Sequence, residues 1–245
     1  MADAAERAGL DDCPVVFLDR ATPSYTAILE CDGNLVIALA DMALYDMFSA
    51  RRLRARSTRD SLDIARHVLC DANLAGPTIT ALAEETTKRG IGLSAIAISP
   101  AKVLRLREAL PRIDHLFLNV AEAESLTGKT AARPEDWPAI LRLAGLRGGS
   151  VTSGGRIAIA FDETSAAAIE PAPVTQIADV TGAGDAFAAG FLRARLAGDD
   201  LCDALRQATA AAAITLASPH ATEENLTPQR LETQLALVPR ARFLP

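Results

Sequence analysis

Asp179-Val180-Thr181-Gly182-Ala183-Gly184-Asp185-Ala186-Phe187 is a glycine-rich turn that directly precedes a predicted helix. Such a turn exposes backbone N–H groups, and the start of the helix adds unpaired N–H groups and the positive end of its dipole. Together these groups form a binding site for an anion such as a phosphate. The carboxylate of Asp185 would repel a bound phosphate, so we expect it to accept a proton from a hydroxyl that attacks phosphorus. The stretch therefore predicts phosphoryl transfer, with Asp185 as the catalytic base.

Two other nucleotide-binding patterns do not fit the chain. Gly182-Ala183-Gly184 begins like G-x-G-x-x-G, but Phe187 occupies the position of the third glycine. Gly128-Lys129-Thr130 resembles the end of a Walker A motif, but Ala123 stands where the first glycine is required. The alternative for residues 182–185 is an ordinary strand-to-helix turn with a capping carboxylate.

The pattern of apolar residues predicts one α/β domain over residues 1–245. The chain is 49% hydrophobic, which suffices for one large core. From about residue 66 short strands alternate with helices, as in a mostly parallel sheet covered on both faces, which binds ligands at the carboxyl ends of its strands. A helix ending near Gly9 is predicted first. We then expect strands at 14–18, 25–30, 34–40, 67–70, 93–98, 115–118, near 150 and 156–161, and helices at 77–89, 100–110, 121–126, 137–144, 186–196, 200–217 and 228–237.

The composition argues against several functional classes. The formal net charge is −6, and we interpret the Arg51-Arg52-Leu53-Arg54-Ala55-Arg56 run as a solvated face rather than a phosphate or RNA patch. The four cysteines form no C-x-x-C pair and there are three histidines, so neither a zinc site nor a disulfide framework is predicted. No apolar run is long enough to span a bilayer, and the acidic N-terminus differs from a signal peptide. We therefore expect a cytoplasmic protein without nucleic-acid or membrane partners.

Two segments of the sequence resemble the ribokinase (PfkB) family of sugar and nucleoside kinases. Residues 179–185 resemble the second signature of this family, with Val180 in place of a frequent threonine. Residues 118–128 resemble its Asn-x-x-Glu segment, in which Asn119 and Glu122 would hold Mg²⁺ and its waters. A capping asparagine followed by a solvated glutamate is the alternative. The resemblance implies a ribokinase-like three-layer α/β/α sandwich with a mostly parallel sheet and a small β lid over residues 14–41.

The same resemblance assigns residues to the side of the site that binds ATP. Val151-Thr152-Ser153-Gly154-Gly155 resembles the strand end beside the ATP phosphates, where Thr152 offers a hydroxyl and Gly154 allows close backbone approach. Thr181 and the N–H groups of Gly182, Ala183 and Gly184 would hold the phosphate charge. Residues 210–216 and Asn225 resemble the helix and loop beside the adenine.

Within the family, the pseudouridine kinases are the most similar. Residues 22–29 and 32–42 resemble their lid strands, which makes Ser24, Tyr25, Asp41 and Met42 candidates for contact with the acceptor. Plain sheet packing is the alternative for these four residues. Lid strands in this family often meet a partner subunit, so a homodimer through the lid is expected. Residues 70–73 also resemble a family strand end, whereas Ile96 stands where the family pattern has an aspartate.

The resemblance does not begin where the family begins. Family members start with a strand and a Gly-Gly-x-x-x-Asn element that holds the acceptor, and Met1 falls within what resembles a later helix. The segments that do match imply, by this resemblance, an ATP-dependent kinase that converts pseudouridine to its 5′-phosphate. The alternatives are a kinase for ribose or another sugar or nucleoside, and a shortened, inactive relative that binds nucleotide only.

Overall fold

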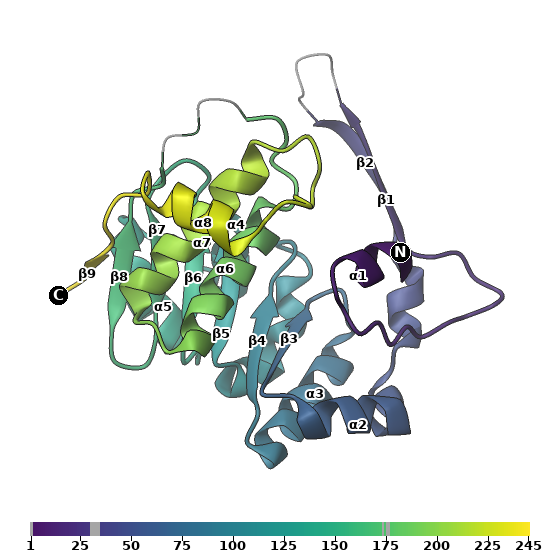
Figure 1. Cartoon of the computed structure of the whole chain (residues 1–245). Coiled ribbons are helices and arrows are strands. Elements are labelled where there is room, and N and C mark those ends of the chain that lie inside the picture. Colours follow the sequence, from purple (N-terminus) through teal and green to yellow (C-terminus); the bar gives the residue numbers. More distant parts are fainter. Residues whose placement is uncertain (1, 30–34, 173, 175–176) are drawn as a thin grey trace.

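A seven-stranded sheet forms the centre of the molecule in the computed structural model, which describes residues 2–29, 35–172, 174 and 177–245 (Figure 1). The strand order is β3-β4-β5-β6-β7-β8-β9. The first four strands run parallel to one another. They are β3 (His67–Asp71), β4 (Gly92–Ile96), β5 (His115–Asn119) and β6 (Gly149–Thr152).

The second half of the sheet is antiparallel, so the sheet is mixed rather than mostly parallel as predicted. Its strands are β7 (Ala158–Phe161), β8 (Ala166–Ile169) and β9 (Arg242–Phe243). The short connections between β6, β7 and β8 turn the chain directly back on itself, and such connections join antiparallel strands. The sequence prediction missed β8, because Ala166-Ala167-Ala168 has little intrinsic preference for a strand. It also missed β9, which is only two residues long.

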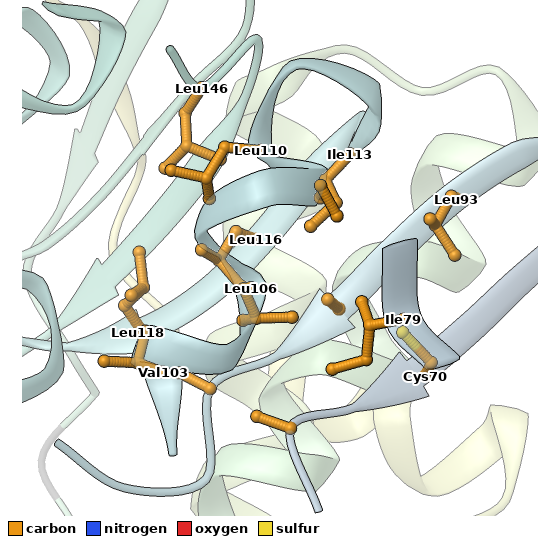
Figure 2. Packing of buried hydrophobic residues seen from close by; sticks show 14 of the residues in the cluster. Cys70, Ile79, Leu93, Val103, Leu106, Leu110, Ile113, Leu116, Leu118 and Leu146 are labelled. Carbon is orange, nitrogen blue, oxygen red and sulfur yellow. The ribbon is translucent and has the colours of Figure 1, made fainter. Parts of the chain in front are cut away.

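Helices cover both faces of this sheet. Successive residues of a strand point to opposite faces, and in β5 Leu116 and Leu118 belong to one buried cluster while Phe117 belongs to the other. The first cluster packs the sheet against α3 (Gly76–Arg89), the 3-10 helix η3 (Val103–Arg112), α4 (Val120–Thr127) and α5 (Trp137–Leu143). Figure 2 shows part of it, with Leu106 beside the strand residue Leu116 and Ile79 beside the strand residue Cys70.

The second cluster packs the other face against α6 (Ala183–Ala197), α7 (Leu201–Leu216) and α8 (Pro228–Leu235). Helices α6 and α7 lie very close together at Gly190, where an added Cβ would be 2.6 Å from the carbonyl oxygen of Gln207. The close packing of α7 fixes the position of α6, whose N-terminus carries the glycine-rich turn.

The N-terminal part of the chain forms a separate two-stranded sheet. Strands β1 (Ser24–Leu29) and β2 (Leu35–Asp41) pair antiparallel, and Figure 1 shows them projecting from the helices and strands of the larger sheet. Helix α1 (Ala2–Arg7) precedes them as predicted. The predicted strand at 14–18 is wrong, because this segment has no strand in the structure. Residues 30–34, between these two strands, lie outside the described residues.

Short helices connect β2 to the large sheet. They are the 3-10 helices η1 (Ala43–Met47) and η2 (Ala50–Arg54), followed by α2 (Arg56–Ile64). A further 3-10 turn, η4 (Pro134–Asp136), precedes α5. The helix predicted at 100–110 is the 3-10 helix η3, and the other predicted helices from residue 77 onward agree with the structure to within a few residues. No helix among the described residues has the length and apolar character needed to cross a membrane.

Candidate active site

A cavity of about 260 Å³ lies where the carboxyl ends of β4, β5 and β6 meet the start of α6. This is the place where sheets with parallel strands bind their ligands. The lining combines two helix starts that each carry a carboxylate, at α4 and α6, with polar strand ends and an apolar wall. The lining residues are Ile96, Ile98, Phe117, Leu118, Asn119, Glu122, Ser150, Thr152, Gly182, Gly184, Asp185 and Phe187.

Gly182 caps the N-terminus of α6 in a conformation that favours glycine. Its φ is 80°, and an added Cβ would lie 1.8 Å from the carbonyl oxygen of Ala221. The loop that follows α7 therefore presses against the backbone of the glycine-rich turn, and only a residue without a side chain fits there. The first N–H groups of α6 have no acceptor within the helix, and they border the cavity at Gly184.

Asp185 lies in the first turn of α6 and lines this cavity. Its side chain keeps contact with solvent. Partial burial nevertheless raises the pKa of its carboxyl, and the negative charge of Asp71 raises it further. A carboxylate with a raised pKa is a stronger base than an ordinary aspartate, so Asp185 is suited to accept a proton.

Asn119 and Glu122 form a capping box at the N-terminus of α4. The Glu122 N–H donates to Asn119 Oδ1 over 2.9 Å, and the Asn119 N–H donates to Glu122 Oε2 over 2.7 Å. Glu122 is buried, and this burial raises its pKa although the bond from the Asn119 N–H opposes the shift. Asn119 is thus the capping residue of the alternative interpretation, whereas Glu122 is buried rather than solvated. Both residues line the cavity.

The structure separates the other residues predicted to contact phosphate. Thr152, at the end of β6, lines the cavity, and its hydroxyl lies 3.4 Å from the carbonyl oxygen of Leu118. Gly154 adopts a φ of 55° in the following turn but is not among the lining residues. The N–H of Thr181 donates to Asp179 Oδ1 over 2.8 Å, so it is already bonded within the turn. Ala183 lies between two lining glycines, and its N–H donates to the carbonyl oxygen of Val180 over 3.5 Å.

The residues predicted for the adenine and the acceptor lie outside this cavity. Asn225 is exposed in the loop after α7, and its N–H donates to Glu223 Oε1 over 2.8 Å. Ser24 pairs with Asp41 across the β1–β2 sheet. The two remaining acceptor candidates are Tyr25, which is exposed, and Met42, which directly follows β2.

Sequence reasoning assigned no role to several residues that line the cavity. Ile96, Ile98, Phe117 and Phe187 form its apolar wall, and Ser150 adds one buried hydroxyl. Strand-end position is the sequence signal for Phe117, and Ile96 was also marked by standing where the family pattern has an aspartate. Ser150 is paired with the buried His115, whose Nε2 lies 2.6 Å from the serine Oγ.

Asn119 and Glu122 are the nearest candidates for a metal site. The structure contains no group of three or more His, Cys, Asp and Glu side chains that could hold a metal ion within the described ranges. The side-chain oxygens of Asn119 and Glu122 match the preference of Mg²⁺ for oxygen ligands, and Mg²⁺ commonly keeps most of its waters. The donor set therefore fits a hydrated Mg²⁺ held by one or two protein oxygens.

Comparisons with known proteins agree with this geometry. The model of the pfkB family of carbohydrate kinases matches residues 1–228. The solved structure of a carbohydrate kinase from Agrobacterium tumefaciens is 51% identical, with a TM-score of 0.88 over 99% of this chain and 78% of that one. The ribokinase of Arabidopsis thaliana, solved with ribose and ATP, is 21% identical, with a TM-score of 0.78 over 94% and 76% of the two chains.

A curated relative is the pseudouridine kinase of Escherichia coli, which is 24% identical over 96% of this chain and 74% of its own length. The match of the family model extends over most of the chain and includes all the residues that line the cavity. The chain belongs to the pfkB family of carbohydrate kinases.

Proposed function

We propose that this protein transfers the γ-phosphoryl group of ATP to the sugar hydroxyl of a ribose-containing acceptor, converting pseudouridine to pseudouridine 5′-phosphate. One observation supports the proposal most strongly. Asp185, with its raised pKa, borders the same cavity as the glycines of the turn and the Asn119–Glu122 pair. A base, an anion cradle and oxygen ligands for a cation are the parts that phosphoryl transfer requires.

In this mechanism Asp185 takes the proton from the acceptor 5′-hydroxyl, whose oxygen then attacks phosphorus in line. The N–H groups of Gly182, Ala183 and Gly184 hold the negative charge that develops on the transferred group. Thr152 contributes a hydroxyl at the end of β6, and residues around Gly154 and Asn225 extend toward the rest of the nucleotide. When bound, ATP would supply the γ-phosphoryl group, and the bond from this group to the β-phosphate oxygen would break as ADP leaves.

Mg²⁺ would neutralise phosphate charge and would be held, through water, by Asn119 and Glu122. The capping box fixes both side chains against α4, so their oxygens are oriented before the cation arrives. The burial of Glu122 favours its neutral form until a cation binds nearby.

We further propose that residues 1–245 form one kinase domain in which residues 14–41 act as a lid. Ser24, Tyr25, Asp41 and Met42 would contact the acceptor once the β1–β2 sheet closes over the cavity. Exposed apolar side chains on this sheet, among them Ile28, Ile37 and Leu39, suit a homodimer formed through the lid.

The choice of pseudouridine is supported by the Escherichia coli relative and by the lid segments of the sequence. It is tested by a screen of pseudouridine, ribose, adenosine and fructose phosphates with ATP and Mg²⁺, in which ADP release is measured. Pseudouridine is expected to give the highest kcat/KM. Faster turnover of another acceptor would replace pseudouridine in the proposal, and no turnover of any acceptor would favour a relative that only binds nucleotide.

The Asp185→Asn variant tests the proposed base in the same assay. The variant is expected to lose at least about a hundredfold in kcat, because general-base catalysis contributes that much. Binding of an ATP analogue should be nearly unchanged. Near-normal turnover by this variant would show that Asp185 is not the base.

A further inference from the structure

Ile98 occupies a strained backbone turn at the edge of the cavity. Its φ is 68°, and among the residues described by the structure it is the only one other than glycine with a positive φ. The N–H of Ser99 donates to the carbonyl oxygen of Ala97 over 2.8 Å, which closes a three-residue turn around Ile98. A γ-turn with a positive central φ is the rare and strained type, and a β-branched residue is poorly suited to it.

The segments on both sides of this turn are firmly held. Before it, the N–H of the fully buried Ala97 donates to the carbonyl oxygen of Phe117 over 3.1 Å. After it, the Val103 N–H donates to the Ser99 carbonyl over 2.9 Å, and the Ser125 hydroxyl donates to the Pro100 carbonyl over 2.6 Å. Strained backbone persists where the surrounding structure determines it in this way.

Core packing does not account for an isoleucine at this position. Ile98 is 38% exposed, and it lines the cavity together with Ile96 and Phe117. Glycine would adopt the same turn without strain. An unfavourable backbone conformation that presents a partly exposed apolar side chain to a binding cavity indicates contact with a ligand.

The position of Ile98 in the sheet indicates which ligand it contacts. Thr152 lies at the end of β6, and the proposed function assigns this part of the cavity to ATP. Ile98 follows β4, on the opposite side of β5. The acceptor must reach Asp185 from the side that the nucleotide leaves free, so Ile98 borders the acceptor.

We propose that Ile98 determines acceptor specificity by packing against an apolar, planar part of the acceptor, so that a ribose carrying a base binds better than ribose alone. This inference rests on the proposed function for the placement of ATP and acceptor. A flat base can pack against the exposed apolar surface of Ile98 and Ile96. A free sugar would bring mainly hydroxyl groups to the same surface. A missing apolar contact of this size lowers binding by about 10-fold or more.

Calorimetric titration of the Ile98→Gly and Ile98→Asn variants with pseudouridine, ribose and a non-hydrolysable ATP analogue tests the inference. Both replacements tolerate a positive φ, so the melting temperature should stay the same or rise by about 2–4 °C. The Kd for pseudouridine should rise about 10-fold, while the Kd values for ribose and for the analogue stay within twofold of the wild-type values. Ile64→Asn, at an exposed position at the end of α2, is the matched control and should change none of these values.

An unchanged Kd for pseudouridine in both Ile98 variants would overturn the inference, as would an equal loss for all three ligands. The outcome is separable from that of the proposed function. Wild-type protein that binds pseudouridine without phosphorylating it contradicts the kinase proposal, and the titrations still test Ile98. Wild-type protein that binds and phosphorylates ribose as well as pseudouridine contradicts only the role of Ile98.

Discussion

Asp71 and Asp185 come from distant parts of the chain, and the charge of Asp71 adds to burial in raising the pKa of Asp185. Asp71 ends β3 and pairs in register with Ile96, which lines the cavity. Its two carboxylate oxygens accept hydrogen bonds from the backbone N–H and the side-chain amide of Asn73, over 2.9 and 2.8 Å. The edge strand of the sheet therefore tunes the proposed base through a carboxylate whose orientation is fixed.

The Asp71→Asn variant should shift the acidic limb of the pH–activity profile to lower pH. Asp185 must be ionised to accept a proton, so activity falls as the pH drops through its raised pKa. Removing the charge of Asp71 leaves only burial to raise the pKa of Asp185, so this pKa decreases toward its ordinary value. The measurement is kcat/KM for the acceptor between about pH 4 and 8.

The control for this shift is Asp203→Asn, which removes the same charge from an exposed position on α7. Its pH profile should match that of the wild type. A limb that does not move in Asp71→Asn, or moves equally in both variants, would contradict a specific effect of Asp71 on Asp185.

The sequence predicted the chemistry of the site better than its walls. Gly182 and Asp185 were singled out from a short glycine-rich pattern, and Asn119 and Glu122 from the resemblance to a family segment. The structure brings these four residues to one cavity, and their chemical roles stay predictions. The contact between Gly182 and Ala221 joins residues far apart in the sequence, and no local pattern reveals it.

The strand predictions failed where tertiary context outweighs local preference. The alanine-rich β8 is a strand because it pairs with β7 and is buried beneath α7. The apolar segment at 14–18 has the composition of a strand but no partner strand in the structure, and it remains irregular. The positive φ of Ile98 had no sequence signal, because isoleucine is among the residues least expected there.

Gly182→Ala should disrupt the start of α6. The new methyl group would lie 1.8 Å from the Ala221 carbonyl oxygen, at a residue whose φ of 80° already disfavours a side chain. Both effects should lower the free energy of unfolding by about 1–3 kcal/mol, and displacement of the turn should reduce kcat by more than about a hundredfold. Urea unfolding and ADP release measure the two effects.

Gly184→Ala is the matched control for stability. Nothing lies within 4 Å of the Cβ that it would introduce, and alanine is a better helix former than glycine. Its free energy of unfolding should equal or exceed that of the wild type. If both variants were equally stable, the contact with Ala221 would not constrain the turn.

Glu122→Gln should weaken the dependence on Mg²⁺ without unfolding α4. Glutamine at this position can still accept the hydrogen bond from the Asn119 N–H, so the capping box persists. Loss of the carboxylate should raise the Mg²⁺ concentration for half-maximal activity by about 10-fold or more. Activity measured against free Mg²⁺ tests this, with the melting temperature as a check on folding. An unchanged Mg²⁺ requirement would remove Glu122 from the proposed cation site.

His115 should make the stability of the protein depend on pH. Burial lowers its pKa to about 3, with contributions from the positive charges of Arg195 and His67. The ring is packed between Phe117 and Phe191, with centroids 4.7 and 4.2 Å away. In the unfolded chain its pKa returns to about 6.5. Below that pH His115 is protonated in the unfolded chain but stays neutral in the folded protein. The free energy of unfolding therefore falls by about 2 kcal/mol between pH 7 and pH 5.

The His115→Gln variant tests this link, because glutamine can still hydrogen-bond Ser150 but does not titrate. At pH 7 the variant should be less stable than the wild type, since the stacking with the two phenylalanines is lost. Between pH 7 and pH 5 it should lose less stability than the wild type in urea unfolding. His220→Gln, at an exposed position, should behave as the wild type does. Equal losses in the wild type and in His115→Gln would show that His115 is not the group responsible for the acid sensitivity of the fold.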